Sequence, residues 1–219
     1  MDKREHLTGA GVSFHAGTHK QYSNQAFVAQ EEILKSVTGG TLEAHLQRTI
    51  FKPLGMAHTS FDTHEQNPDS VVPMMGTDKV PMDMARFLQL KHPAAGLFST
   101  APDLLTLGQC LLNEGAHANG EIISKLTLRE MVRPQTTGIR SQMPDDWTND
   151  VDFGLTFIRP NYTKSIVHKN TYGHNGWGGC KFWVYPDEGV CFALMTNLMD
   201  PGLHGVDTDI LHNVFSACL

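Results

Sequence analysis

Cysteine is scarce in this sequence of 219 residues, which contains four, at positions 110, 180, 191 and 218. They form no CxxC pair and no cysteine and histidine spacing typical of a zinc site, and they are too few for a disulfide framework. We therefore interpret them as free thiols. The 12 histidines do not recur at i and i+4 with an acidic neighbour, so we expect no metal and no other cofactor.

Positive charge is also limited, because 17 lysines and arginines stand against 23 aspartates and glutamates, for a net charge of -6. This balance disfavours a broad nucleic-acid-binding surface, and a small-molecule substrate is the better expectation. No uncharged apolar run approaches the roughly 18 residues that a membrane span needs. The first six residues, MDKREH, lack the apolar core of a signal peptide. As it stands, the sequence predicts a cytoplasmic location, and the compartment of a longer product is left open.

Most short catalytic motifs are absent. The sequence has no HExxH, no GxxxxGK[ST], no GxGxxG and no GxSxG, which argues against the zinc-protease, P-loop, dinucleotide-binding and α/β-hydrolase classes. The segment nearest to GxSxG is Gly11-Val12-Ser13-Phe14-His15, and it lacks the closing glycine.

Apolar periodicity predicts helices in the first part of the chain. One helix carries an apolar stripe over residues 26–37 and stops at Gly39-Gly40, and a short second helix through residues 42–50 ends before Pro53. Thr100 and Asp103 resemble a capping box for a third helix, which runs to about Gly115. A fourth, short helix around residues 128–132 ends at Pro134.

The pattern then changes to strands, predicted at residues 153–158, 165–169, 181–185 and 190–196, with a hairpin turn at residues 186–189. The last two runs are apolar at nearly every position, which favours strands covered on both faces. A closing helix through Ile210, Leu211, Val214 and Phe215 is expected to supply one cover. The fold class is thus α/β (α+β), with a mainly helical part at residues 1–150 and a sheet plus C-terminal helix at residues 151–219.

Two short segments remain as candidates for function. Tyr22-Ser23-Asn24 precedes the first helix, where a tyrosine is usually structural and Ser23 or Asn24 would cap the helix. The segment 173–179, GHNGWGG, is rich in glycine. Such glycines usually mark a bulge or bend, but they also allow a ligand to approach the backbone closely.

Taken together and in this order, the segments resemble the serine β-lactamase and penicillin-binding-protein superfamily, in particular its branch of class C β-lactamases, family VIII carboxylesterases and D-aminopeptidases. Residues 14–24 are similar to the family's F-x-P-G-T…Y-S-N, with alanine in place of proline. Residues 51–59 and 95–103 are similar to the passages "PLGM…T" and "GGL.STA.D". His174-Asn175-Gly176 stands where the family has Lys-Thr-Gly or His-x-Gly, and Asn197 matches the closing "TN".

The resemblance implies a β-lactamase-like fold and hydrolysis of a β-lactam, an ester or a D-amino-acid peptide through an acyl-enzyme. Tyr22 would be the general base or proton relay. Asn24 would orient the substrate's carbonyl or the family's lysine, or would cap the helix. His174 would line the site and form a hydrogen bond to the substrate or to Tyr22. The backbone N–H of Trp177 would contribute to an oxyanion hole. The remaining substrate-binding positions implied are Ser23, Asn175 and Gly176.

One family motif is missing, because none of the ten serines has lysine three residues later, as the nucleophile motif S-x-x-K requires. We therefore expect a fragment that lacks the nucleophile helix and the N-terminal strands, is inactive alone and either pairs with a segment carrying S-x-x-K or self-associates. Without the family's lysine, Tyr22 is expected to remain a protonated phenol. The alternatives are a non-catalytic relative that binds a ligand or partner, and an incomplete product without activity.

Overall fold

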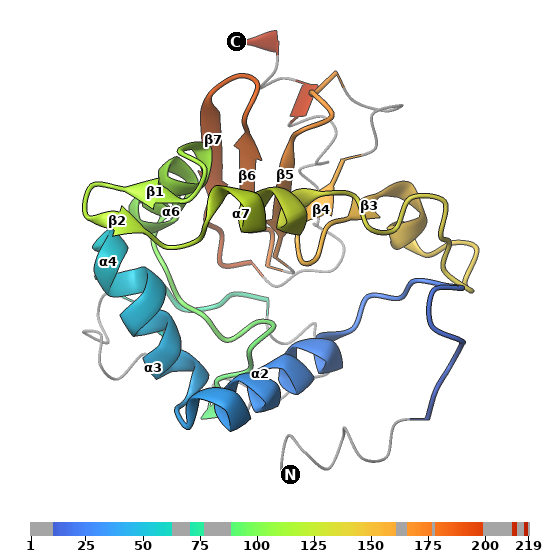
Figure 1. Cartoon of the computed structure of the whole chain (residues 1–219), viewed down its shortest axis with the longest axis horizontal. Coiled ribbons are helices and arrows are strands. Elements are labelled where there is room, and N and C mark those ends of the chain that lie inside the picture. The colour runs from blue at the N-terminus through green and yellow to red at the C-terminus, as the bar shows by residue number, and fades with distance from the viewer. Residues whose placement is uncertain are drawn as a thin grey trace.

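The computed structural model describes residues 11–62, 71–76, 89–160, 166–176, 178–198, 212–213 and 217–218. Helices α2, α3 and α4 lie on one side of the molecule, and a sheet lies on the other with α6 and α7 across one of its faces (Figure 1). The helical elements are α2 (Asn24–Thr38), α3 (Leu42–Leu46), the π-helical η1 (Gln47–Phe51), α4 (Lys52–Leu54), α6 (Ala101–Leu112), α7 (Lys125–Val132) and the 3-10 turn η4 (Trp147–Asp150). The strands are β1 (Ala116–His117), β2 (Gly120–Glu121), β3 (Asp152–Phe153), β4 (Ile158–Arg159), β5 (Tyr172–Asn175), β6 (Lys181–Tyr185) and β7 (Val190–Leu194).

Helix α2 confirms the first predicted helix and has clear signals at both ends. The Ser23 hydroxyl accepts the Ala26 N–H at 3.3 Å, and Gly39, at φ +70°, ends the helix by donating its N–H to the Lys35 carbonyl at 2.9 Å. The apolar stripe is not a core face, however, because Ile33 and Val37 are 64% and 81% exposed.

The second predicted helix extends further than expected. Helical turns continue from α3 through η1 into α4, so the chain does not leave the helix before Pro53. Pro53 lies in the first turn of α4, directly after the π-helical turn η1. Gly55, at φ +71°, ends the run.

The third and fourth predicted helices are confirmed as α6 and α7. Thr100 caps α6 by accepting the Asp103 N–H at 3.3 Å, and Gly115 follows the helix at φ +97°. Ser124 caps α7 by accepting the Thr127 N–H at 3.2 Å, and the helix ends at Val132. The two helices therefore follow local signals in the sequence.

The sheet is antiparallel throughout, with the order β3-β4-β5-β6-β7. The predicted strand 181–185 and the turn 186–189 are confirmed, and the predicted strand 190–196 is shorter, ending at Leu194. The single strand predicted at 153–158 is wrong, because the chain reverses between β3 and β4. The turn places Gly154 where an added Cβ would lie 2.2 Å from the Met131 carbonyl oxygen, so a side chain has no room there.

The strand predicted at 165–169 is also wrong for residues 166–169, which form no strand, while Ser165 lies outside the described residues. The place beside β4 is taken by β5, which was not predicted because its glycine interrupts the strand pattern. Gly173 is required there, since an added Cβ would lie 2.2 Å from the Phe182 carbonyl oxygen and 2.6 Å from Trp183. Close backbone approach, rather than residue preference, therefore places this strand.

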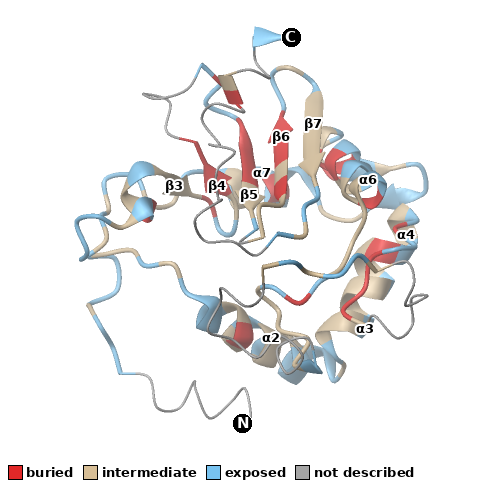
Figure 2. Ribbon diagram, turned by 180° about the vertical axis from the view of Figure 1, so that it is seen from behind, coloured by how far each residue is buried: buried red, intermediate tan, exposed pale blue. Residues whose placement is uncertain are grey.

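Both faces of the central strands are covered, as predicted. On one face, Val184 packs with Leu111 of α6 and Leu128 of α7; on the other, Trp183 and Tyr185 pack with Ile158 and Val167. Figure 2 shows buried residues on β4, β5 and β6 and also on the helices, including α6.

The expected closing helix is only partly described, because Ile210, Leu211, Val214 and Phe215 lie outside the described residues. The described His212 is fully buried, its Nδ1 lies 2.9 Å from the Tyr185 hydroxyl, and its ring lies 4.5 Å from that of Trp183. The division of the chain at residue 150 stays a prediction. All four cysteines are free thiols, as expected. Within the described ranges, the structure contains no helix of the length and apolarity that a membrane crossing needs.

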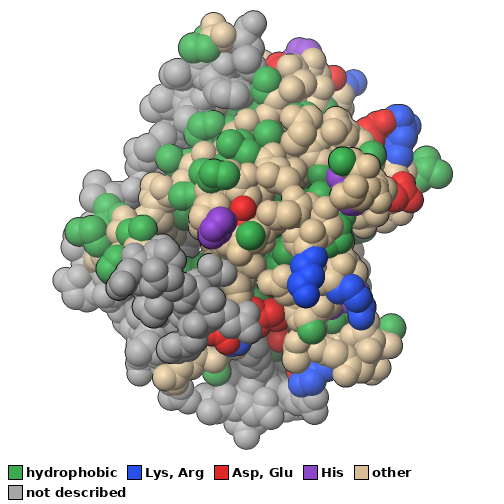
Figure 3. Space-filling model, turned by 90° about the vertical axis from the view of Figure 1, so that its left-hand side faces the viewer, with side chains coloured by type: hydrophobic (Ala, Val, Ile, Leu, Met, Phe, Trp, Pro, Cys, Tyr) green, Lys and Arg blue, Asp and Glu red, His purple; other side chains and the backbone are tan. Residues whose placement is uncertain are grey.

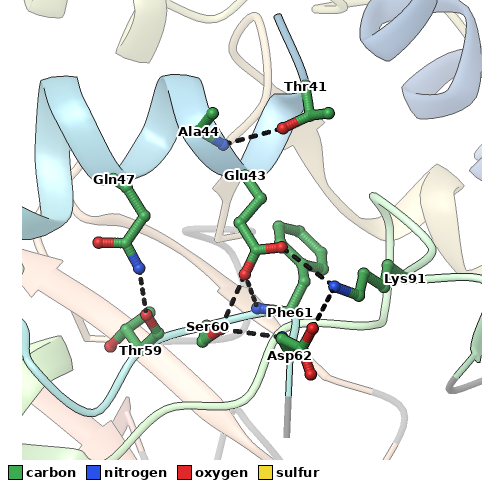
Figure 4. A network of polar contacts seen from close by, with 9 residues as sticks. All are labelled: Thr41, Glu43, Ala44, Gln47, Thr59, Ser60, Phe61, Asp62 and Lys91. Carbon is green, nitrogen blue, oxygen red and sulfur yellow. Dashed lines mark hydrogen bonds and ion pairs between the residues drawn. The ribbon is translucent and has the colours of Figure 1, made fainter. Parts of the chain in front are cut away.

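A polar network joins α3 to the segment that follows α4 (Figure 4). Glu43 Oε1 accepts the Ser60 hydroxyl at 2.8 Å and the Phe61 N–H at 3.1 Å. Lys91 Nζ bridges Asp62, at 2.6 Å, and Glu43, at 3.3 Å. The bond to Asp62 is the main reason why the pKa of Lys91 is raised. This network fixes the path of the chain between the helical side and α6.

The two passages similar to "PLGM…T" and "GGL.STA.D" meet in the same region. The Thr59 hydroxyl donates to Asp103 Oδ2 at 2.7 Å, and the His58 N–H donates to the same oxygen at 2.8 Å. Ser99 Oγ lies 2.8 Å from Thr59 Oγ1. Thr59 and Asp103 are 1% and 6% exposed. These two passages are therefore joined by hydrogen bonds in the fold. The Asp103 carboxylate binds Thr59 and His58, so it does not accept the Thr100 N–H as a capping box would require.

Candidate functional site

The structure brings together the two segments singled out in the sequence. Tyr22 precedes the Ser23 cap of α2, and His174 lies in β5. Their ring centroids are 6.0 Å apart, at the place where the first turn of α2 approaches the end of the sheet (Figure 1). A phenol and an imidazole from distant parts of the chain therefore share one site.

The start of α2 determines the roles open to Ser23 and Asn24. Ser23 is the helix cap, since its side chain accepts the Ala26 N–H. Asn24 is the first residue of the helix and is exposed. The capping interpretation thus holds for Ser23, and the Asn24 amide faces solvent next to Tyr22 in the sequence.

Tyr22 is partly buried, and burial raises the pKa of its phenol above the ordinary value. Desolvation disfavours the charged phenolate, so the phenol is protonated at neutral pH. This direction agrees with the expectation from the absent lysine. As a proton carrier, Tyr22 would need a cation close to its oxygen to become a base.

His174 is partly buried, and burial lowers the pKa of its imidazole despite an opposing hydrogen bond to the backbone of Asn175. The ring is therefore neutral at pH 7. Nδ1 lies 2.7 Å from the Asn175 carbonyl oxygen, a contact that requires Nδ1 to carry the proton, because a carbonyl can only accept. Nε2 is then a hydrogen-bond acceptor, suited to a hydroxyl of the substrate or of Tyr22.

The residues after His174 form a tight turn. The Gly176 N–H donates to the Cys180 carbonyl at 2.6 Å, and the Gly179 N–H donates back to Gly176 at 3.0 Å. The Asn175 side chain accepts the Trp183 indole N–H at 3.0 Å, so it fixes the strand rather than reaching out of it. Gly176 is exposed, and Trp177, predicted as an oxyanion donor, lies outside the described residues.

The sequence analysis missed Trp147, which belongs to this site. Its ring centroid lies 5.6 Å from that of Tyr22 and 5.9 Å from that of Phe153. It was overlooked because it stands in a polar loop without periodicity. An isolated aromatic residue in such a loop was the only signal in the sequence.

Lys20 was also missed. Its Nζ donates to the Val151 carbonyl at 2.7 Å and lies 6.0 Å from the centroid of the Phe153 ring. Burial lowers the pKa of Lys20, an effect that the carboxylates of Asp152 and Asp146 oppose. Lys20 therefore connects the segment that precedes Tyr22 to the segment that follows Trp147.

The described residues contain no group of three or more His, Cys, Asp or Glu side chains placed to hold a metal ion. On the face shown in Figure 3, lysine and arginine side chains occur in small groups, with acidic and hydrophobic side chains among them. The distribution of charge on this face does not test whether the chain binds a small-molecule substrate, which stays a prediction.

The family follows from a match that spans nearly the whole chain: the sequence model of the beta-lactamase family fits residues 2–214. The chain belongs to the beta-lactamase family. It is 26% identical to the N-acetylmuramyl-L-alanine amidase of Bacillus subtilis (strain 168) over 222 residues, which cover 88% of this chain and 47% of that protein. It is 25% identical to a Salmonella typhi protein named as a D-alanyl-D-alanine carboxypeptidase, covering 85% and 47% of the two chains.

The fold agrees with this family. The crystal structure of a penicillin-binding-protein homologue from Caulobacter crescentus superimposes with a TM-score of 0.73 at 20% identity, over 99% of this chain and 63% of that one. The predicted β-lactamase-like fold is thus confirmed. The chain spans about half the length of the curated relatives that it matches.

Proposed function

We propose that this chain forms one wall of the active site of a β-lactamase-family serine hydrolase, which cleaves an amide, ester or β-lactam bond through an acyl-enzyme. The observation that carries the proposal is the contact between Tyr22 and His174, 6.0 Å between ring centroids. The two rings come from the two segments that resemble the family's active-site motifs. The family match and the relatives named as amidase and carboxypeptidase support the class of reaction.

In this proposal the nucleophile comes from a segment carrying S-x-x-K, since no serine of this chain has lysine three residues later. The serine oxygen attacks the carbonyl carbon of the substrate while its proton passes to the Tyr22 phenolate. Tyr22 then gives that proton to the leaving amine or alcohol, and water releases the acyl group by the same route in reverse. The lysine supplies the cation without which burial keeps Tyr22 protonated.

The surface of the chain fits such a complement. Helix α2 carries Ile33 and Val37 one turn apart, 64% and 81% exposed, and we propose that the supplied segment covers them. We therefore propose an N-terminal segment as the first partner of the chain, and self-association as what happens when that segment is lacking.

Complementation tests the proposal. The chain is mixed or co-expressed with the N-terminal segment of a family relative, and hydrolysis of a chromogenic cephalosporin, a p-nitrophenyl ester and a D-alanyl peptide is followed. The matched control carries alanine at the serine of the supplied S-x-x-K. We expect hydrolysis of at least one substrate when the chain is combined with the intact segment, and none when it is combined with the alanine control. A complex that forms but hydrolyses none of them would instead favour the non-catalytic binding protein.

The chain alone supplies the second half of this test. Intact mass spectrometry after incubation with a penicillin or an activated ester should show no stable adduct, because loss of the nucleophile removes several orders of magnitude in rate. An adduct that maps to one of the ten serines of the chain would show that the chain contains the nucleophile. It would overturn the proposal that the nucleophile comes from another segment.

A further inference from the structure

The loop that carries Trp147 is held in shape by its own side chains. Asp146 caps η4 by accepting the Thr148 N–H at 2.9 Å, and it accepts the Ser141 hydroxyl at 2.7 Å. Asn149 closes the loop from the other side, accepting the Ser141 N–H at 2.8 Å and donating to the Met143 carbonyl at 3.0 Å. Such a loop presents a side chain in one orientation, which is what a contact with a ligand requires.

The same loop is fastened to the segment that bears Tyr22. The Lys20 N–H donates to the Arg140 carbonyl at 3.1 Å, just before the loop, and Lys20 Nζ donates to the Val151 carbonyl at 2.7 Å, just after it. Both ends of the loop are thus tied to a residue two positions from Tyr22. The distance between the Trp147 and Tyr22 rings therefore follows from the backbone and not only from contact between the rings.

Trp147 remains open to solvent in spite of these contacts. Its side chain is 49% exposed although its ring lies against those of Tyr22 and Phe153. Among the residues that the structure describes, no partner accepts a hydrogen bond from its indole N–H. An indole held rigidly yet half exposed beside the proposed proton carrier is a surface for a flat apolar group.

We propose that Trp147 is a specificity-determining residue, which packs against an aromatic or similarly flat apolar part of the substrate while Tyr22 serves the reacting bond. The inference rests on the proposed function and names the substrate class more closely. Stacking on an indole is directional and contributes beyond the area buried, so an aromatic substituent should bind several-fold more tightly than a methyl group.

The test uses the chain itself and measures binding, so it needs no activity. The chain is labelled with ¹⁵N at tryptophan, and the indole N–H signals are followed while phenylacetyl-D-alanine or acetyl-D-alanine is added to millimolar concentration. The Trp147 signal is assigned by its loss in Trp147→Phe. Trp183 is an internal control, because it is 1% exposed and its indole N–H is bonded to Asn175.

We expect the phenylacetyl compound to shift the Trp147 signal and to bind about fivefold or more tightly than the acetyl compound. Trp147→Ala should abolish this preference, and Trp147→Phe should retain part of it because a flat ring remains. Leu155→Ala, at another exposed apolar residue of this region (60% exposed), should leave the preference unchanged. If Trp147→Ala does not fold, the shift in the unsubstituted chain and the Trp147→Phe affinity still decide the question.

Equal affinity for the two probes, or no shift of the Trp147 signal, would overturn the inference. The outcome is separable from that of the proposed function. A chain that prefers the aromatic probe but gives no hydrolysis after complementation would retain Trp147 as a binding residue and contradict the hydrolase. Hydrolysis after complementation, with equal affinity for the two probes, would support the hydrolase and contradict the role of Trp147.

Discussion

The contact between Thr59 and Asp103 allows the sharpest quantitative prediction about the fold. One oxygen of the Asp103 carboxylate accepts both the Thr59 hydroxyl and the His58 N–H, at 2.7 and 2.8 Å, and both Thr59 and Asp103 are buried. A hydrogen bond to a charged group contributes about 1.5–3 kcal/mol, and a buried donor left without an acceptor adds a desolvation cost. Asp103→Ala removes the acceptor of both donors, so it should lower the free energy of unfolding by about 3–5 kcal/mol.

A double-mutant cycle isolates the bond between the two side chains. Thr59→Val keeps the shape of the side chain but removes the donor, and it should cost about 1–3 kcal/mol. Because the double variant loses this bond only once, the two single effects should exceed the double effect by about 1.5 kcal/mol. The measurement is urea unfolding followed by circular dichroism. The control is Thr127→Val, an exposed threonine of α7 whose hydroxyl lies 2.8 Å from the exposed Ser124 hydroxyl; it should cost less than about 1 kcal/mol and show no coupling to Asp103. A coupling below about 0.5 kcal/mol between Thr59 and Asp103 would refute the interpretation that their hydrogen bond stabilises the fold.

Two further predictions concern the sheet. Gly173→Ala should destabilise the chain by about 2–4 kcal/mol in urea, because the added Cβ would lie 2.2 Å from a backbone oxygen of β6; Gly11→Ala, where the Cβ would meet nothing within 4 Å, is the control, and equal effects would contradict the close approach. Burial lowers the pKa of His212 to about 4, so the unfolded chain, with an ordinary histidine pKa near 6.5, binds the proton more readily. Stability present above about pH 6.5 should be lost as the pH falls towards about 4, by about 2 kcal/mol at pH 5; His212→Phe should remove this part of the pH dependence, and an unchanged profile would show that the histidine is not the cause.

The sequence predicted those elements whose signals are local. Thr100 caps α6, and the helix through residues 26–37 ends at Gly39, as expected. Strands β6 and β7 are apolar at nearly every position, as expected for strands that are covered on both faces. In each case the physical cause of the element lies in residues that are neighbours in the sequence.

The errors arose where distant backbone decides. Strand β5 contains Gly173, which weakens a strand pattern but is required by the nearness of β6. The reversal between β3 and β4 depends on the fit of Gly154 against the end of α7, which no window of sequence reveals. The site follows the same rule: Tyr22 and His174 were found through the family resemblance, whereas Trp147 came to light only from its place in the fold.

The kcat/KM of the Tyr22→Phe variant, measured in the complemented protein, tests the central claim most directly. The substitution keeps the ring that contacts His174 and Trp147 and removes only the oxygen that would carry the proton. Loss of a general base usually lowers the rate by about 10²–10⁴, so we expect a fall of that size, and a smaller one for His174→Ala, which positions rather than transfers. A Tyr22→Phe variant whose kcat/KM stays within a factor of about three, under about 1 kcal/mol of transition-state stabilisation, would contradict the role of Tyr22 as the base.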